Sequence, residues 1–136
     1  MKSSGTPNAA SGHMDHEQIV TERIIGCAIE VHKDLGPGLL EKPYLIAVCV
    51  ELAHQGIRFE RERTIGLQYR GVNIGDFIPD LIVEERVVVE IKSCLRDEDV
   101  FTAQMLTYLR LTKLRVGLIL NFNKRMLRDG IKRVVL

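Results

Sequence analysis

The first pattern in the chain is helical, because apolar side chains recur every three or four residues between His16 and Leu35. Asp15 stands directly before this segment as a predicted N-cap, with Gln18 three residues later as in a capping box. Gly36 and then Pro37 form a stop signal, since glycine accepts a left-handed conformation and proline cannot continue a helix. The pattern therefore predicts a long first helix with a defined start and end.

A second helix is predicted over about Leu40 to Gln55, where a glycine follows and ends it. Pro43 is tolerated in this helix only in the first turn, where its missing N–H costs nothing. The helix therefore has Glu41 at its very start. A third helix is predicted from about Glu98 to Leu111, with Asp97 as its cap.

Four strand-like segments lie between the second and third predicted helices, and a fifth follows the third helix. The four are GIRFERE, TIGLQYRG, VNIGDFIPDLIV and RVVVEIKSC, with a turn allowed at Gly71. The fifth, RVGLILNF, is apolar almost throughout, which is typical of a strand that is buried on both faces. The tail, NKRMLRDGIKRVVL, is expected to add a short helical turn and an edge strand.

The predicted order of elements is helix, helix, a run of strands, helix and strand. Strands joined by hairpins can pair antiparallel, and the strand after the third helix can add in parallel through a crossover. We therefore predict a mixed α/β sheet flanked by helices. The length of 136 residues fits one domain over 15–136, preceded by a disordered leader or tag remnant over 1–14.

Composition argues against several classes of protein. No apolar run approaches the ~18 residues that span a bilayer, and no charged-then-apolar leader opens the chain. Cys27, Cys49 and Cys94 are odd in number and far apart, which suggests neither a disulfide framework nor a zinc or iron–sulfur site. A reducing, cytoplasmic setting fits this use of cysteine best.

Charge is unevenly distributed along the chain, although the net charge is only +1. Met105 to Leu136 contains eight Lys or Arg and one acid, whereas Asp80 to Asp99 contains seven acids and three bases. A basic flank beside an acidic centre suits a phosphate-bearing substrate that approaches a metal site. The alternative is an ordinary solvated face with an exposed tail, and charge alone favours this alternative.

The segment PDLIVEERVVVEIKS, Pro79 to Ser93, places charged side chains in strands that are otherwise apolar. If EER forms a three-residue loop centred on Glu85, Asp80 lies opposite Glu90, with Cβ atoms about 4.5–5.5 Å apart. Lys92 lies two residues beyond Glu90 and therefore on the same face, while the alternating apolar residues face the core. The pairing matters because a slip of one residue would turn these side chains to opposite faces.

Opposed carboxylates destabilise a sheet unless something offsets their repulsion. A hard divalent cation such as Mg²⁺ or Mn²⁺ does so, and its bound water has a lowered pKa that permits attack on a phosphodiester. Lys92, a compact cation, is positioned to orient that water or to stabilise charge that builds on phosphorus. The alternative is that Glu90 and Lys92 are polar positions on an exposed strand and that Asp80 merely sits in a turn after Pro79.

The pattern PD, nine residues and then EIK resembles the core motif of the PD-(D/E)XK nuclease superfamily. Longer segments are similar, in order and spacing, to the GxxExxY family, which is usually placed in that superfamily and is named here for Gly38, Glu41 and Tyr44. These segments are IIGCAIEVHKDLGPGLLEKPY, PDLIVEERVVVEIKS, AQMLTYLRLTKLRVGLILNFN and DGIKRVVL. The similarity extends over roughly Gln18 to Leu136, with a mild departure at KPYLIAV, where a more polar stretch is expected.

The resemblance implies a restriction-endonuclease-like core of order αβββαβ. It implies that Asp80 and Glu90 bind metal together with the backbone carbonyl of Ile91, and that Lys92 is the catalytic lysine. Glu41 matches an acidic residue that the superfamily often brings in from its first core helix, and it would ligate the metal directly or through water.

Gln104 and Tyr108 match the QxxxY motif of related nucleases, and their i, i+4 spacing puts both on one face of the third helix. Gln104 is expected to reach Lys92 or a substrate phosphate, and Tyr108 to stack on or hydrogen-bond to the substrate. Lys124 and Arg125, in the basic C-terminal third, are further predicted substrate contacts. The alternative is that Tyr108 is a core aromatic and Gln104 an incidental surface residue.

These residues support a metal-dependent nuclease that hydrolyses phosphodiester bonds of nucleic acid, DNA rather than RNA, with Mg²⁺ or Mn²⁺ as cofactor. A second hypothesis is a catalytically idle nuclease fold that binds nucleic acid or a protein partner. An idle site, however, has no reason to keep carboxylates that repel each other. A homodimer is compatible with the first hypothesis.

Overall fold

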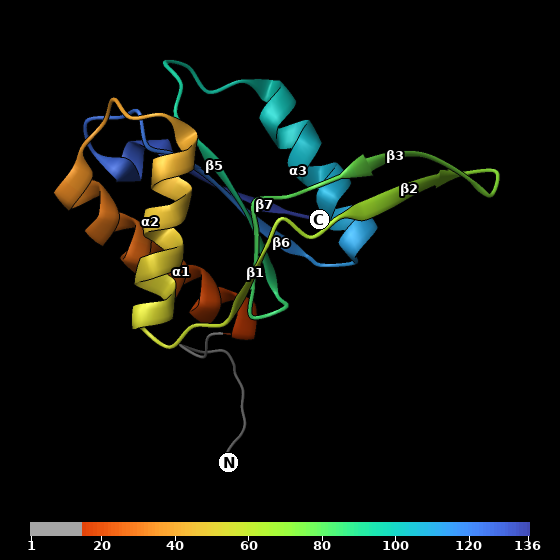
Figure 1. Cartoon of the computed structure of the whole chain (residues 1–136), viewed down its shortest axis with the longest axis horizontal. Coiled ribbons are helices and arrows are strands. Elements are labelled where there is room, and N and C mark those ends of the chain that lie inside the picture. The colour runs from red at the N-terminus through yellow and green to blue at the C-terminus, as the bar shows by residue number, and fades with distance from the viewer. Residues whose placement is uncertain (1–14) are drawn as a thin grey trace, which may run out of the picture.

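The computed structural model describes residues 15–136, so the leader or tag remnant predicted over 1–14 lies outside the described residues. The helices are α1 (His16–Leu35), α2 (Glu41–His54), α3 (Asp99–Thr112) and the short 3₁₀ helix η1 (Leu127–Gly130) (Figure 1). The strands are β1 (Phe59–Arg61), β2 (Ile65–Tyr69), β3 (Val72–Phe77), β4 (Leu81–Val83), β5 (Val87–Lys92), β6 (Val116–Asn121) and β7 (Ile131–Val135). Within residues 15–136, every helix is too short or too polar to span a lipid bilayer.

The helices begin and end close to their predicted positions. α1 has the predicted bounds, and Asp15 Oδ1 accepts a hydrogen bond from the Gln18 N–H at 2.7 Å. α2 is one residue shorter at each end than predicted. α3 differs at its start, because Glu98 rather than Asp97 occupies the N-cap position. The Asp97 carboxylate instead accepts a hydrogen bond from the Asn121 amide at 3.0 Å, a partner that is distant in the sequence.

Five strands form a mixed sheet in the order β1-β4-β5-β6-β7. β5 and β6 are parallel and connected through α3, whereas the other neighbours in this sheet are antiparallel. Every residue of β6 is buried, as its apolar sequence predicts, and β7 is the edge strand expected in the tail. The αβββαβ order is therefore present, with β1, β4 and β5 as the three strands of this sheet that precede α3.

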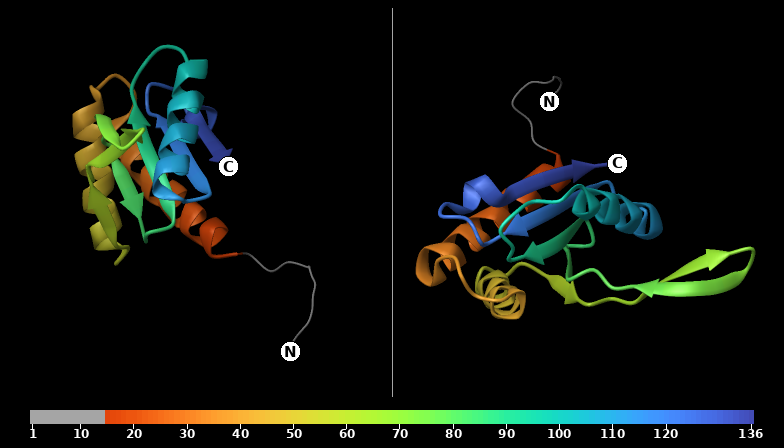
Figure 2. Two further views of the ribbon diagram at one scale, coloured as in Figure 1. Left: turned by 90° about the vertical axis from the view of Figure 1, so that its right-hand side faces the viewer. Right: turned by 90° about the horizontal axis from the view of Figure 1, so that it is seen from above.

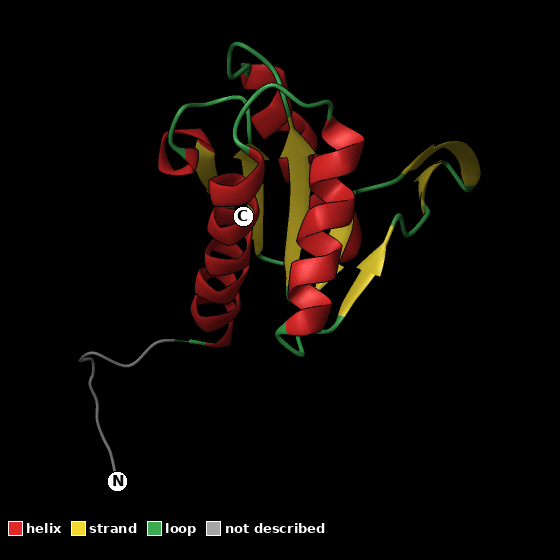
Figure 3. Ribbon diagram, turned by 60° about the vertical axis from the view of Figure 1, so that its left-hand side comes forward, coloured by secondary structure: helices red, strands yellow, loops and turns green. Residues whose placement is uncertain are grey.

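Helices cover both faces of this sheet. α1 and α2 pack on one face and α3 on the other, as Figure 2 shows, and Figure 3 looks onto the face that α1 and α2 cover. Alternate residues of β5 divide between the two layers: Val89 and Ile91 belong to the core under α1 and α2, whereas Val88 packs with α3. Glu90 and Lys92 therefore lie on the α3 side of the sheet.

The segment VNIGDFIPDLIV is not one strand, in contrast to the prediction. β3 ends at Phe77 and β4 begins at Leu81, and Pro79 between them lacks the N–H that a continuous ladder needs. β2 and β3 form a separate two-stranded sheet that projects from the body of the molecule (Figures 1 and 2). Gly71, with φ of 80°, lies in its turn as predicted. The Phe77 ring ties the base of the hairpin to α3 by an edge-on contact with Tyr108, with ring centres 6.2 Å apart.

Candidate active site

The turn between β4 and β5 brings two acidic residues opposite each other. Residues 84–86 make this turn, and Leu81 pairs with Val89 across the two strands. Asp80 precedes β4 by one residue, so the same register places it opposite Glu90. This is the register that the sequence predicts, and both side chains lie on the α3 side of the sheet.

Asp80 and Glu90 are each oriented by the backbone of the facing strand. The Asp80 N–H donates to Glu90 Oε1 at 2.7 Å, and the Ile91 N–H donates to Asp80 Oδ2 at 2.8 Å. Hydrogen bonds to ionised acceptors are strong and directional, so they hold both carboxylates in one orientation. They occupy Asp80 Oδ2 and Glu90 Oε1, whereas Glu90 Oε2 lies 3.9 Å from the Lys92 ammonium.

Both carboxyl groups hold their protons more tightly than ordinary carboxyl groups do. Burial, and then the charge of Asp80, raise the pKa of Glu90 from 4.5 to about 7. Burial also raises the pKa of Asp80, against the opposing effect of the Ile91 N–H. The charge of Glu41, at the head of α2, raises the pKa of both groups. The two carboxyl groups ionise with difficulty because they are partly buried and close together. A bound cation would favour their ionised forms.

The Lys92 ammonium lies on the same side of the sheet as these carboxylates. Its Nζ atom is 3.9 Å from Glu90 Oε2 and 3.5 Å from Gln104 Oε1, so Gln104 lies within reach of Lys92 as the sequence predicts. The ring of Phe101, one turn earlier in α3, has its centre 4.3 Å from Nζ. Only 14% of the Lys92 side chain is exposed, so these three groups define where the ammonium sits.

The sequence of residues 18–134 matches the family model of the PD-(D/E)XK nuclease superfamily. The chain belongs to this superfamily. Its mixed five-stranded sheet with flanking helices agrees with the restriction-endonuclease-like fold that the sequence predicts. No curated protein matches the chain in sequence. Among solved structures, the chain is similar to the crystal structure of an alkaline exonuclease (LHK-Exo) from Laribacter hongkongensis, with a TM-score of 0.45 and 13% identity over 88% of this chain and 81% of that chain.

PD-(D/E)XK nucleases typically use divalent metals, and the buried acids of this member fit such an ion. Asp80 and Glu90 offer hard oxygen ligands, and Mg²⁺ is commonly bound by one or two carboxylates while it keeps several waters. Within residues 15–136, no three His, Cys, Asp or Glu side chains lie close enough together to form a metal cluster. The charge of Glu41 nevertheless acts on both Asp80 and Glu90, and its role as a metal ligand, direct or through water, stays a prediction.

Tyr108, a predicted substrate contact of this PD-(D/E)XK protein, is largely buried in the structure. Only 4% of it is exposed, and its ring packs against Phe77 under α3. Burial raises the pKa of its hydroxyl to about 12, and the charges of Glu90 and Asp80 add to this effect. This burial fits the alternative of a core aromatic, and a contact between the Tyr108 hydroxyl and the substrate stays a prediction. Helical spacing put Tyr108 beside Gln104, but the packing of α3 decides that the tyrosine faces inward.

Lys124 and Arg125 lie after β6 and have partners away from the carboxylate pair. The Lys124 ammonium is 3.6 Å from the Asp97 carboxylate, and the Lys124 carbonyl accepts a hydrogen bond from His32 Nε2 at 2.8 Å. Arg125 is exposed and lines a hollow beside the end of α1 with Lys33. The role of both residues in substrate binding stays a prediction.

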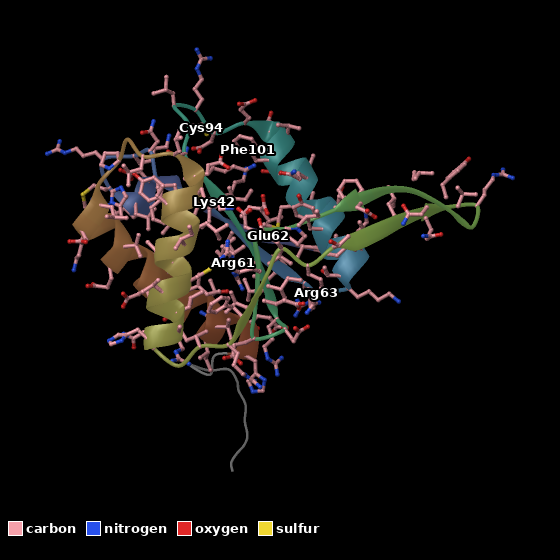
Figure 4. The ribbon with its side chains drawn as sticks, viewed as in Figure 1. Lys42, Arg61, Glu62, Arg63, Cys94 and Phe101 are labelled. Carbon is pink, nitrogen blue, oxygen red and sulfur yellow. The ribbon has the colours of Figure 1, made fainter. Side chains whose placement is uncertain are left out.

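Other residues near the site carry no sequence signal of their own. The Glu62 N–H donates to the Asp80 carbonyl at 3.1 Å, and the Glu62 charge raises the pKa of Asp80. Figure 4 shows Lys42, Arg61 and Glu62 between α2 and the β2–β3 hairpin, with Phe101 at the start of α3. The pairing of β1 with β4 brings Arg61 and Glu62 here, and no local motif marks that pairing.

Proposed function

We infer that the protein is a metal-dependent nuclease that hydrolyses phosphodiester bonds of nucleic acid, with DNA as the first substrate. The observation that carries this inference is the pair of Asp80 and Glu90, each bonded to the backbone of the facing strand and each with a raised pKa. Two like charges held together in a partly buried place cost stability in the absence of a cation. The chain belongs to a nuclease superfamily, which suggests that the two carboxylates serve phosphodiester hydrolysis.

Asp80, Glu90 and the carbonyl of Ile91 would hold Mg²⁺ or Mn²⁺, with Glu41 in contact through water. Such an ion, when bound, lowers the pKa of a water and offsets charge on the phosphate. Glu90 must give up its proton for this purpose, because only the ionised carboxylate is a good ligand. The hydrogen bonds from Asp80 and Ile91 N–H groups keep both carboxylates oriented while this happens.

Lys92 would stabilise the negative charge that builds on the phosphate oxygens during attack. Its ammonium has three N–H donors, and the long contact with Gln104 engages at most one of them. The carboxylate of Glu90 and the ring of Phe101 restrict where the ammonium can move. The remaining donors are therefore available to a phosphate that is placed beside the carboxylates.

Lys42 and Arg61 are the first candidates for contacts with flanking phosphates. Both are exposed, and in residues 15–136 neither takes part in an ion pair. Lys124, by contrast, already pairs with an acid. A positive charge on the open side of the site attracts the backbone of nucleic acid in a salt-dependent way.

The test is cleavage of single-stranded and duplex DNA by the purified full chain with Mg²⁺ or Mn²⁺, compared with EDTA. Asp80→Asn and Lys92→Ala should each lower the rate by about 100-fold or more, because each removes a group that acts on the reacting phosphate. Asp76→Asn and Lys113→Ala change exposed residues of β3 and of the end of α3 and serve as matched controls. If Asp80→Asn and Lys92→Ala cut as fast as the unchanged protein, the assignment fails.

A catalytically idle nucleic-acid-binding protein is the second candidate, because exposed cations such as Lys42 and Arg61 need no metal to bind phosphates. Such a protein should bind nucleic acid equally well with and without metal, and its affinity should fall with salt in proportion to its phosphate contacts. A nuclease should gain affinity or activity from the ion.

We also propose that the chain is a member of the GxxExxY family. Gly38 has φ of 108°, a region that favours glycine, and it lies in the segment that leads to Glu41. The Tyr44 hydroxyl donates to the Gly36 carbonyl and accepts from the Leu39 N–H at 3.1 Å. The motif residues thus shape one segment, whose end places Glu41 at the head of α2.

A further inference from the structure

Leu95 and Leu40 are the most exposed large apolar residues of the described chain, at 85% and 81%, followed by Val50 at 64%. Single exposed leucines are ordinary on a protein surface. These two differ because the segments that carry them meet near candidate site residues: Ser93 is bonded to Leu39, and the charges of Glu41 and Lys92 both act on Cys94. Leu40 directly precedes Glu41, and Leu95 follows Lys92 by three residues.

Hydrogen bonds hold the two segments that carry these leucines. The Ser93 hydroxyl donates to the Leu39 carbonyl, which ties the segment after β5 to the segment before α2. The Cys94 N–H donates to Asn121 Oδ1 at 3.2 Å, and the Asn121 amide donates to the Cys94 carbonyl at 3.0 Å. The Leu39 N–H donates to the Tyr44 hydroxyl at 3.1 Å. The residue before each leucine is therefore tied by hydrogen bonds to another part of the protein.

A cation follows each leucine closely in the sequence. Lys42 stands two residues after Leu40, Arg96 stands directly after Leu95, and both cations are exposed. Three exposed acids, Asp97, Glu98 and Asp99, follow Arg96, and Asp97 is paired with Lys124. In the part of the chain that the structure describes, neither Lys42 nor Arg96 makes an ion pair. An apolar side chain beside a free cation suits a nucleotide, whose base has apolar faces and whose phosphate is anionic. A stable protein interface needs roughly 800 Å² from each partner, far more than two separate leucines supply.

We propose that Leu40 and Leu95 contact unpaired nucleobases next to the phosphodiester bond that the site cuts, so that the substrate is single-stranded or unpaired nucleic acid. This inference rests on the proposed nuclease function. Bases within a duplex are stacked on one another and do not offer their faces to a side chain. Unpaired bases can lie against the leucines while Lys42 and Arg96 contact the phosphates on either side.

The test measures binding of the full chain in EDTA by fluorescence anisotropy, with three labelled DNA probes. The probes are a single strand of mixed sequence, the same strand with a run of abasic sites, and a blunt duplex. The unchanged protein should bind the base-bearing strand about tenfold more tightly than the abasic strand, because burial of a leucine is worth more than 1 kcal/mol. It should also prefer the single strand to the duplex.

The variant with both Leu40→Ser and Leu95→Ser should reduce the ratio between base-bearing and abasic strands to about twofold or less. Its affinity for the abasic strand should stay the same, because phosphate contacts set that affinity. Val50→Ser, which changes an exposed apolar residue elsewhere on α2, should keep the tenfold ratio. Equal midpoints of thermal unfolding verify that the variants fold.

The inference is overturned if the variant keeps the ratio of the unchanged protein, or if the unchanged protein prefers the duplex. It is overturned as well if none of the probes binds. Binding in EDTA is separate from cleavage, so the two proposals fail independently. If the protein cuts DNA but the double leucine variant keeps the tenfold ratio of binding, the nuclease function stands and this inference fails. If the ratio depends on the leucines as expected but the protein does not cut DNA, the contact to unpaired bases stands and the nuclease function fails.

Discussion

The Lys92 ammonium lies 4.3 Å from the centre of the Phe101 ring. The face of an aromatic ring attracts a cation by about 0.5–2 kcal/mol, with the higher value where water is excluded. Glu90 also faces this ammonium, at 3.9 Å, but its charge is shared with any metal that binds the carboxylate pair. We therefore expect Phe101 to position Lys92 most strongly in the metal-loaded protein.

Phe101→Leu should lower kcat of DNA cleavage by about tenfold while KM changes little, because about 1.4 kcal/mol of attraction to the ammonium is lost. Phe101→Tyr keeps the aromatic face and should keep kcat. Steady-state kinetics of the two variants check this. A leucine variant as active as the tyrosine variant would show that the ring serves packing alone.

Glu90 should make the metal-free protein less stable as the pH rises from about 4.5 to about 7. Its pKa is 4.5 in the unfolded chain and about 7 in the folded protein, so the folded state binds more protons in this window. The contribution is fully present below the lower value and is lost as the pH passes the higher one. It changes the free energy of unfolding by on the order of 3 kcal/mol.

Urea unfolding in EDTA at several pH values measures this dependence. Glu90→Gln carries no titratable group and should show a flatter profile, while Asp80 still contributes in the same direction because its pKa is also raised. Stability that increases with pH across this window, or an unchanged profile in Glu90→Gln, would contradict the assignment.

Metal binding should strengthen as the pH rises from about 5.5 to about 7.5, because the ion must displace the proton of Glu90. Calorimetric titration with Mn²⁺ in buffers of different ionisation enthalpy should show release of about one proton per ion near the lower pH. Asp80→Asn should abolish this binding, and Asp76→Asn on the projecting hairpin should leave it intact. Proton release that is the same at both pH values would count against Glu90 as the ligand that titrates.

Tyr44→Phe should lower the free energy of unfolding by about 1–3 kcal/mol, because two partly buried hydrogen bonds, each worth about 0.5–1.5 kcal/mol, are lost. The ring itself should remain in place, since it stacks on Phe122 with centres 4.5 Å apart. Nuclease activity should also fall, because the hydroxyl shapes the segment before Glu41. Urea unfolding and cleavage rates measure both effects, with Tyr69→Phe as the control, since Tyr69 is 61% exposed. Equal stability of the two variants would contradict the role of the hydroxyl.

Local signals explain why much of the fold was predictable. α1 has its predicted bounds because a cap, a helical period and a Gly-Pro stop all act within a few residues of one another. The pairing of Asp80 with Glu90 was predictable for the same reason, because a short turn and a period of two determine the register. Pro79 had a local effect that the prediction overlooked, since it separates β3 from β4 and frees the projecting hairpin.

Contacts between distant segments explain the rest. Asp97 does not cap α3, because Asn121 at the end of β6 and Lys124 just after β6 compete for its carboxylate. Glu62 reaches Asp80 only through the pairing of β1 with β4. Neither partner is marked by spacing along the chain.

The sequence by itself determined the three long helices, most of the strands and which two carboxylates face each other, because these depend on periodicity and on a turn of a few residues. Only the tertiary structure decided that Tyr108 is buried while Gln104 reaches Lys92, and that Phe101 lies against the ammonium. The physical reason is that helical spacing defines a shared face, whereas the angle and depth at which a helix packs on the sheet depend on side chains from the whole core.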